Sequence, residues 1–223
     1  MGVVHAKRLL VEGKDDAYAI ASLMSHFVAW GDTERQWPVL LEPAGSAQEL
    51  LAEEVVPTYL SEPGTKILGV LIDANESFEQ RWQRIRQVCL PAYPGLPEQC
   101  PAQGLIQHEG RLPRFGVWIM PDNRSRGMLE SFLKLLVPTE PQELWAHAQA
   151  ATRRAKQLGA PYKDAHCDKA DIHTWLAWQD QPGKPLGEAL KSKCLDPRSA
   201  CATAFVEWFI RLFDLESLRL PAQ

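Results

Sequence analysis

Four short apolar runs, each closing on an acidic residue, divide the first two thirds of the chain. They span residues Leu9–Glu12, Val39–Glu42, Ile67–Asp73 and Phe115–Asp122. Segments with helical spacing of apolar residues lie between them. Short buried strands that alternate with helices are typical of a parallel sheet joined by crossover connections. The pattern therefore predicts an α/β fold, with a mostly parallel sheet of about four strands flanked by helices.

The segments between the strands carry recognisable helix signals. After Glu12, apolar residues recur at helical spacing, so a helix is expected to begin at Asp15 or Asp16 and to close at Gly31. Ser46 and Glu49 have the spacing of a capping box, which would open the next helix. Further helices are expected over residues 76–89 and 128–136.

Two regions depart from this alternation. Residues 91–114 are rich in Pro and Gly and predict a long irregular insertion. Beyond Pro138 the chain is expected to be helical over residues 142–158, 168–179 and 199–215. The simplest organisation is an α/β domain at residues 1–140, with a helical carboxyl-terminal region at 141–223 packed on it as one structural unit.

The charge of the chain is uneven. Its 223 residues carry a formal net charge of −4, of which residues 1–63 contribute −6 and the remainder +2. A polyanion would therefore have to be met by local basic residues, and Arg124 and Arg126 beside the turn at Asp122 are candidates. The five cysteines form no Cys-x-x-Cys pair, which favours free thiols. We find no pattern of a signal peptide or membrane span, and expect a cytoplasmic protein without membrane partners.

The acids at the strand ends are the main candidate chemistry. The carboxyl ends of parallel strands meet at one edge of a sheet, so Glu12, Asp73 and Asp122 should converge there. Several converging carboxylates repel one another unless a cation lies between them, and oxygen ligands suit hard divalent cations. The sequence thus predicts a Mg²⁺ or Mn²⁺ site. The simpler alternatives are helix caps and turn residues, or a ribose-binding acid at Asp73.

The motifs at these positions resemble a known superfamily. Val11-Glu12-Gly13 with Asp16, the strand ending Asp73-Ala74-Asn75, and an acidic turn before a helix carrying Glu130 are similar to the Toprim domain of topoisomerases, primases and OLD (overcoming lysogenization defect) nucleases. The stretches 116–123, 127–130 and 169–177 look like a stand-alone bacterial Toprim-like family of unknown function. The resemblance covers about residues 5–180.

This resemblance implies roles for individual residues. Metal ligands would be Glu12, Asp16 and Asp73, with Asn75 at the second acid of the usual Asp-x-Asp motif and with Asp122 and Glu130 completing a second site. Glu12 could be a ligand or a general base. Lys169 is the counterpart of the late lysine that OLD-type nucleases use for transition-state charge. Asn75 departs from the family pattern, because a neutral amide brings less charge to a cation.

The function implied is cleavage of DNA or RNA phosphodiesters by a metal-dependent nuclease, with a role in phage defence. The alternative is a catalytically weak regulatory module that partners an ATPase, and nucleotidyl transfer is a third possibility. The chain has no Gly-x-x-x-x-Gly-Lys-Ser/Thr loop, so any ATP hydrolysis would come from a partner. The sequence does not determine the oligomeric state, and a homo-oligomer is one of the options.

Overall fold

Three parallel strands that are buried on both faces form the centre of the sheet. A computed structural model describes residues 5–139, 142–192 and 194–221. The sheet has five strands in the order β2-β1-β3-β5-β4. Their bounds are β1 Lys7–Val11, β2 Leu40–Pro43, β3 Ile67–Asp73, β4 Leu105–Gln107 and β5 Arg114–Met120. All neighbouring pairs are parallel except β4 with β5. The predicted α/β class is confirmed.

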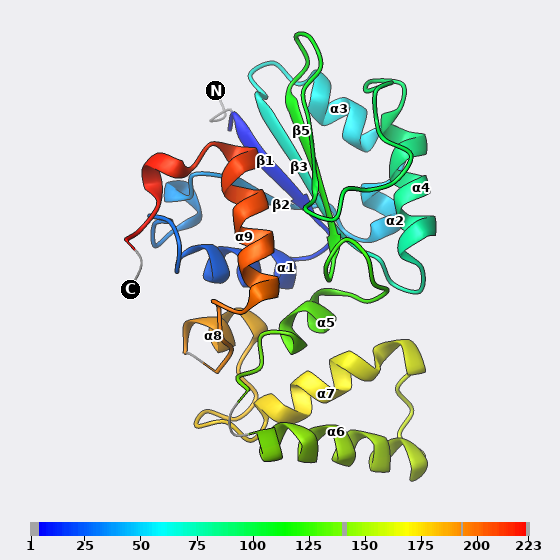
Figure 1. Ribbon diagram of the computed structural model, residues 1–223, viewed down its shortest axis with the longest axis vertical. Coiled ribbons are helices and arrows are strands. Elements are labelled where there is room, and N and C mark those ends of the chain that lie inside the picture. The colour runs from blue at the N-terminus through cyan, green and yellow to red at the C-terminus, as the bar shows by residue number, and fades with distance from the viewer. Residues whose placement is uncertain (1–4, 140–141, 193, 222–223) are drawn as a thin grey trace.

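Helices cover both faces of the sheet and the carboxyl ends of its strands (Figure 1). Their bounds are α1 Lys14–Met24, α2 Ala47–Leu50, α3 Val55–Ser61, α4 Phe78–Cys89, α5 Leu129–Lys134, α6 Gln142–Gln157, α7 Cys167–Leu176, α8 Leu186–Lys191 and α9 Ala200–Phe213. Short 3₁₀ turns lie at Glu34–Gln36, Asp164–His166 and Glu216–Leu218. No helix in the described ranges is long and apolar enough to cross a membrane.

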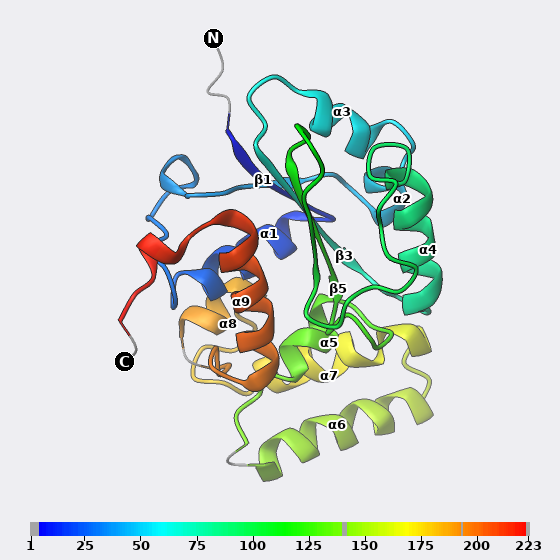
Figure 2. The same ribbon diagram turned by 45° about the horizontal axis from the view of Figure 1, so that its top comes forward.

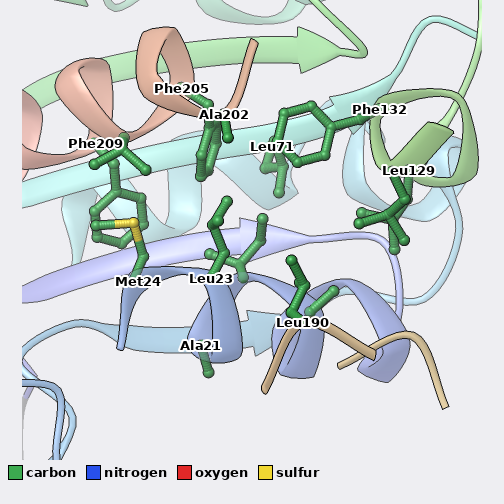
Figure 3. Close-up of a cluster of buried hydrophobic side chains, with 14 of the residues drawn as sticks. Ala21, Leu23, Met24, Leu71, Leu129, Phe132, Leu190, Ala202, Phe205 and Phe209 are labelled. Atoms are coloured by element: carbon green, nitrogen blue, oxygen red, sulfur yellow. The ribbon is translucent and has the colours of Figure 1, made fainter. Parts of the chain in front are cut away.

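The two faces of the sheet have separate hydrophobic cores. One face is covered by α1, α8 and α9, and the other by α2, α3 and α4 (Figures 1 and 2). Side chains of α1, α5, α8 and α9 meet Leu71 of β3 in the first core (Figure 3). This arrangement leaves the carboxyl edge of the sheet to α5 and to the α6–α7 hairpin, which lie below it (Figure 2).

Several local expectations are confirmed. Ser46 Oγ accepts a hydrogen bond from the Glu49 amide, and the Glu49 carboxylate accepts one from Ser46 N, so the capping box is present. Ser77 and Ser199 also cap α4 and α9, although these caps were not predicted: their hydroxyl oxygens accept hydrogen bonds from the amides of Gln80 and Ala202. All five cysteines are free thiols.

Three expectations need correction. The first helix ends at Met24 rather than Gly31, because the chain leaves the helix there and forms an isolated bridge between Val28 and Arg219. The 91–114 insertion is not wholly irregular, since it contains β4, whose Leu105 pairs with Val117 of β5. The sheet therefore has five strands, where the sequence predicted about four. A further helix, α8, packs against α1 and was not predicted.

Candidate functional site

Glu12 follows β1 and connects three elements at the carboxyl edge of the sheet. Its Oε1 accepts a hydrogen bond from the Asp73 amide at 2.8 Å, and its Oε2 accepts one from the Ala47 amide at 3.1 Å. The half-buried carboxylate thus ties the end of β1 to the end of β3 and to the first turn of α2. Each oxygen keeps a further lone pair, so these bonds do not exhaust its acceptor capacity.

Asp16 lies in the first turn of α1, directly beside Glu12. Its Oδ2 accepts a hydrogen bond from the Gly13 amide at 2.8 Å, which fixes the carboxylate over the extended residue that precedes the helix. Burial, followed by the negative charges of Glu12 and Glu130, raises the pKa of Asp16 from 3.8 to about 6. Burial and the neighbouring carboxylates therefore disfavour ionisation of this group.

Asp73 is the last residue of β3, where an apolar strand delivers a carboxylate to the same edge. It accepts a hydrogen bond from the Leu129 amide at the start of α5. Burial raises its pKa well above 3.8, and the charges of Glu12, Asp16 and Glu130 raise it further. Asp73 is thus the carboxylate at this edge whose ionisation is disfavoured by the charges of three other acids.

Glu130 and Lys169 complete the group from two helices. Glu130 lies in the first turn of α5 and is only 5% exposed, whereas the Lys169 side chain on α7 is 52% exposed. Their Oε1 and Nζ atoms lie 2.7 Å apart. The hydrogen bond with Glu130 raises the pKa of Lys169, with smaller contributions from Asp15 and Asp73.

These side chains line one cavity of about 310 Å³ at the carboxyl edge of the sheet, which we call the acidic cavity. It is lined by five acids, Glu12, Asp15, Asp16, Asp73 and Glu130, and two lysines, Lys14 and Lys169. In their observed rotamers, no three His, Cys, Asp or Glu side chains among the described residues are arranged to hold a metal ion together. The cavity nevertheless has more carboxylates than ammonium groups, and the side-chain atoms in it that could bind a cation are carboxylate oxygens.

Two predicted ligands lie outside this cavity. Asn75 adopts a left-handed conformation, with φ of 55°, and its backbone pairs with Gly127 through hydrogen bonds of 2.7 and 2.9 Å. Its exposed side chain lines a neighbouring cleft instead. The Asp122 carboxylate accepts hydrogen bonds from the backbone amides of Arg124 and Ser125 and from the Ser125 hydroxyl. It therefore closes its own turn, as the simpler alternative predicted.

The neighbouring cleft has a volume of about 850 Å³ and meets the acidic cavity at Met128, which lines both. We call it the basic cleft. It lies between the first half of α4, the turn at Gly127 and residues 163–168. Arg126 lines it, but Arg124 does not. Sequence reasoning missed Arg81 and Arg84 as site residues, and only the one-turn spacing of bases on α4 signalled them.

Comparison with known proteins gives a single finding. The family described as "Protein of unknown function (DUF3226)" has a model that matches residues 6–214. No curated protein and no solved structure matches the chain.

Proposed function

We propose that this chain, which belongs to the DUF3226 family, is a divalent-metal-dependent nuclease of the Toprim type that cleaves nucleic-acid phosphodiesters at the acidic cavity. One observation carries the proposal. Glu12, Asp16, Asp73, Glu130 and Lys169 come from four separate parts of the sequence and line one cavity at the carboxyl edge of a parallel sheet. Ligands of open α/β sheets bind at this edge.

The donor set fits Mg²⁺ or Mn²⁺. The acids supply hard oxygen donors, and their mutual repulsion would be relieved by a cation. Mg²⁺ is usually held by one or two carboxylates, with waters and substrate phosphates as its other ligands, so a closed cage of three protein groups is not required. Asp73 and Asp16 would be the main ligands, with Glu12 and Glu130 beside them. When bound, such an ion supplies Lewis-acid polarisation of a phosphoryl oxygen and a lowered pKa for water.

The protein's own residues would position the phosphodiester and balance its charge. Lys169 reaches the cavity from α7, and its half-exposed side chain could turn its ammonium from Glu130 towards a phosphate oxygen. A fixed positive charge next to a reacting phosphate stabilises the charge of the transition state. Glu12, held by two backbone amides, would keep the ends of β1 and β3 at a constant separation.

The geometry favours one cation rather than two. Asn75 and Asp122 both lie outside the cavity, so Glu130 is the only one of the two residues expected to complete a second site that lines it. The proposed site therefore depends on a single cation together with Lys169, which is a simpler arrangement than the two-metal sites of many nucleases.

A second candidate is the regulatory module that partners an ATPase. It is favoured by the internal pairing of the acids, because both Glu12 oxygens accept backbone hydrogen bonds and Glu130 is paired with Lys169. A cluster satisfied in this way could serve the fold alone. A role in phage defence, with either function, follows from the Toprim resemblance.

Calorimetric titration with Mn²⁺ tests the proposal. The wild type should bind Mn²⁺ and cut plasmid or single-stranded DNA or RNA in its presence, and Asp73→Ala should lose both properties while keeping the fold. Asp122→Asn is the matched control, because it removes one carboxylate outside the cavity, and it should bind Mn²⁺ as the wild type does. Absence of Mn²⁺ binding by the wild type, or metal-independent cutting by Asp73→Ala, would reject the nuclease in favour of the partner module.

A further inference from the structure

The basic cleft is lined by a group of positively charged side chains. Its basic side chains are Arg81 and Arg84 of α4, Arg126 of the turn before α5, and Lys163 before α7. None of these four forms a salt bridge in the described part of the chain. Basic side chains that face a cleft without a salt bridge are available to an anion.

The acids of the same cleft are mostly engaged elsewhere. Asp168 pairs with Lys134 at 2.5 Å, and Asp164 pairs with Lys156 at 3.2 Å. Only Glu76 remains of the three acids in its lining. The cleft is thus locally positive in a chain whose net charge is −4, and it lies beside a cavity that is locally negative.

The backbone connects the two charged regions within a few residues. Arg81 Nε donates a 2.7 Å hydrogen bond to the carbonyl oxygen of Asp73, the residue whose side chain lies in the acidic cavity. Residues 74–77 then line the basic cleft. A chain of phosphates could therefore place one group at the acidic cavity, beside its cation, and the adjacent groups over α4 and residues 163–168.

We propose that the basic cleft binds the sugar-phosphate backbone of a nucleic-acid strand and leads it to the acidic cavity, an inference that rests on the proposed nuclease function. Arg84, Arg126 and Lys163 would be its phosphate contacts. The described lining contains no Phe, Tyr or Trp on which a base could stack. Binding is therefore driven by phosphate charge and is independent of base sequence.

Binding to fluorescent oligonucleotides in EDTA tests this inference without any cleavage. The variant Arg84→Gln/Arg126→Gln/Lys163→Gln is compared with Arg35→Gln/Arg154→Gln/Lys191→Gln, which removes the same charge from exposed positions outside the cleft. The cleft variant should bind at least tenfold more weakly, and the slope of log affinity against log salt should fall by about 2. The control should bind as the wild type does. Single-stranded DNA, duplex DNA and RNA of several sequences serve as the probes.

Arg84 also donates to the Leu51 carbonyl, so its replacement could disturb the fold. Arg126→Gln/Lys163→Gln keeps that contact, changes only exposed side chains, and should still weaken binding severalfold with a slope reduced by about 1 to 2. An equal loss of oligonucleotide affinity in the cleft and control variants, or no oligonucleotide binding by the wild type, would overturn the inference.

If the inference failed in this way but Mn²⁺ still bound and its binding still depended on Asp73, the acidic cavity would remain the proposed site, with a smaller phosphodiester as its substrate. Loss of Mn²⁺ binding with retained oligonucleotide binding would instead overturn the nuclease function alone.

Discussion

Lys169 Nζ lies 2.7 Å from Glu130 Oε1, and this ion pair joins α7 to α5 at the edge of the acidic cavity. Glu130 is buried, so its charge depends on the lysine for compensation. The same lysine is the only part of α7 that lines the cavity. The pair therefore affects both the stability of this edge of the fold and the net charge of the acidic cavity.

Replacing the lysine should separate these two effects. Lys169→Met leaves Glu130 unpaired and should lower the free energy of unfolding in EDTA by about 1–3 kcal/mol. Mn²⁺ should bind more tightly, because a tethered cation no longer competes for the cavity. The measurements are chemical unfolding and calorimetry. Lys191→Met, which removes an exposed lysine paired with Glu188, should change neither. Weaker Mn²⁺ binding by Lys169→Met would contradict this account.

The raised pKa of Asp16 predicts a pH-dependent stability. The folded-state pKa is about 6 against 3.8, so the native state takes up the proton more readily than the unfolded chain. The contribution of Asp16 is fully present below pH 3.8 and is lost as the pH rises through 6. Asp73, shifted in the same direction, adds to the loss. In EDTA, the melting temperature of the wild type should therefore fall relative to Asp16→Asn between pH 4 and 7.

Asp16→Asn keeps an oxygen for the Gly13 amide and should melt about 2 °C or more above the wild type at pH 7. The exposed Asp15→Asn removes the same charge nearby and serves as the control. Saturating Mn²⁺ should raise the melting temperature of the wild type more than that of Asp16→Asn. If the melting temperatures of the wild type and Asp16→Asn changed with pH in the same way, ionisation of Asp16 would not destabilise the fold.

Lys134 anchors the α6–α7 hairpin to α5. Its ammonium lies 2.5 Å from Asp168 and 3.0 Å from Asp171, and the Thr152 hydroxyl of α6 donates to the other Asp171 oxygen. Lys134→Met would leave the buried Asp171 without its cation and should cost about 3 kcal/mol, or about 6–12 °C in melting temperature. A double-mutant cycle with Asp171→Asn should show strong coupling. Additive effects would mean that the pair is not a unit.

Two paired glycines allow α9 to pack closely on the sheet. Gly69 of β3 lies opposite Gly116 of β5, and a Cβ at Gly116 would come within 2.4 Å of Leu212. Gly116→Val should therefore destabilise the fold by about 1–3 kcal/mol through overpacking. Gly95→Ala, whose added carbon meets the flexible end of Gln107, should be tolerated. The melting temperatures of the two variants are compared with that of the wild type. An unchanged melting temperature for Gly116→Val would mean that α9 does not pack closely against Gly116.

The sequence by itself determined the elements that bury the most apolar surface. The strands β1, β3 and β5 were predicted because their side chains are apolar on both faces, and α4 and α9 because their apolar residues recur at helical spacing. The three-residue β4 was not predicted, since its pattern is too short to stand out among prolines and glycines. Its position comes from pairing with β5 and from the hydrogen bond that Trp208 donates to the Leu105 carbonyl.

The same distinction holds for the site. The sequence placed Glu12 and Asp73 at strand ends, and parallel strands necessarily bring such ends to one edge. The resemblance added Asp16, Glu130 and Lys169, and only the tertiary structure brought all five to one cavity. The tertiary structure also decided which predicted ligands lie outside the cavity. The left-handed turn at Asn75 and the closed turn at Asp122 direct these side chains away within a few residues of a strand end, because the path of the chain after a strand depends on contacts distant in sequence.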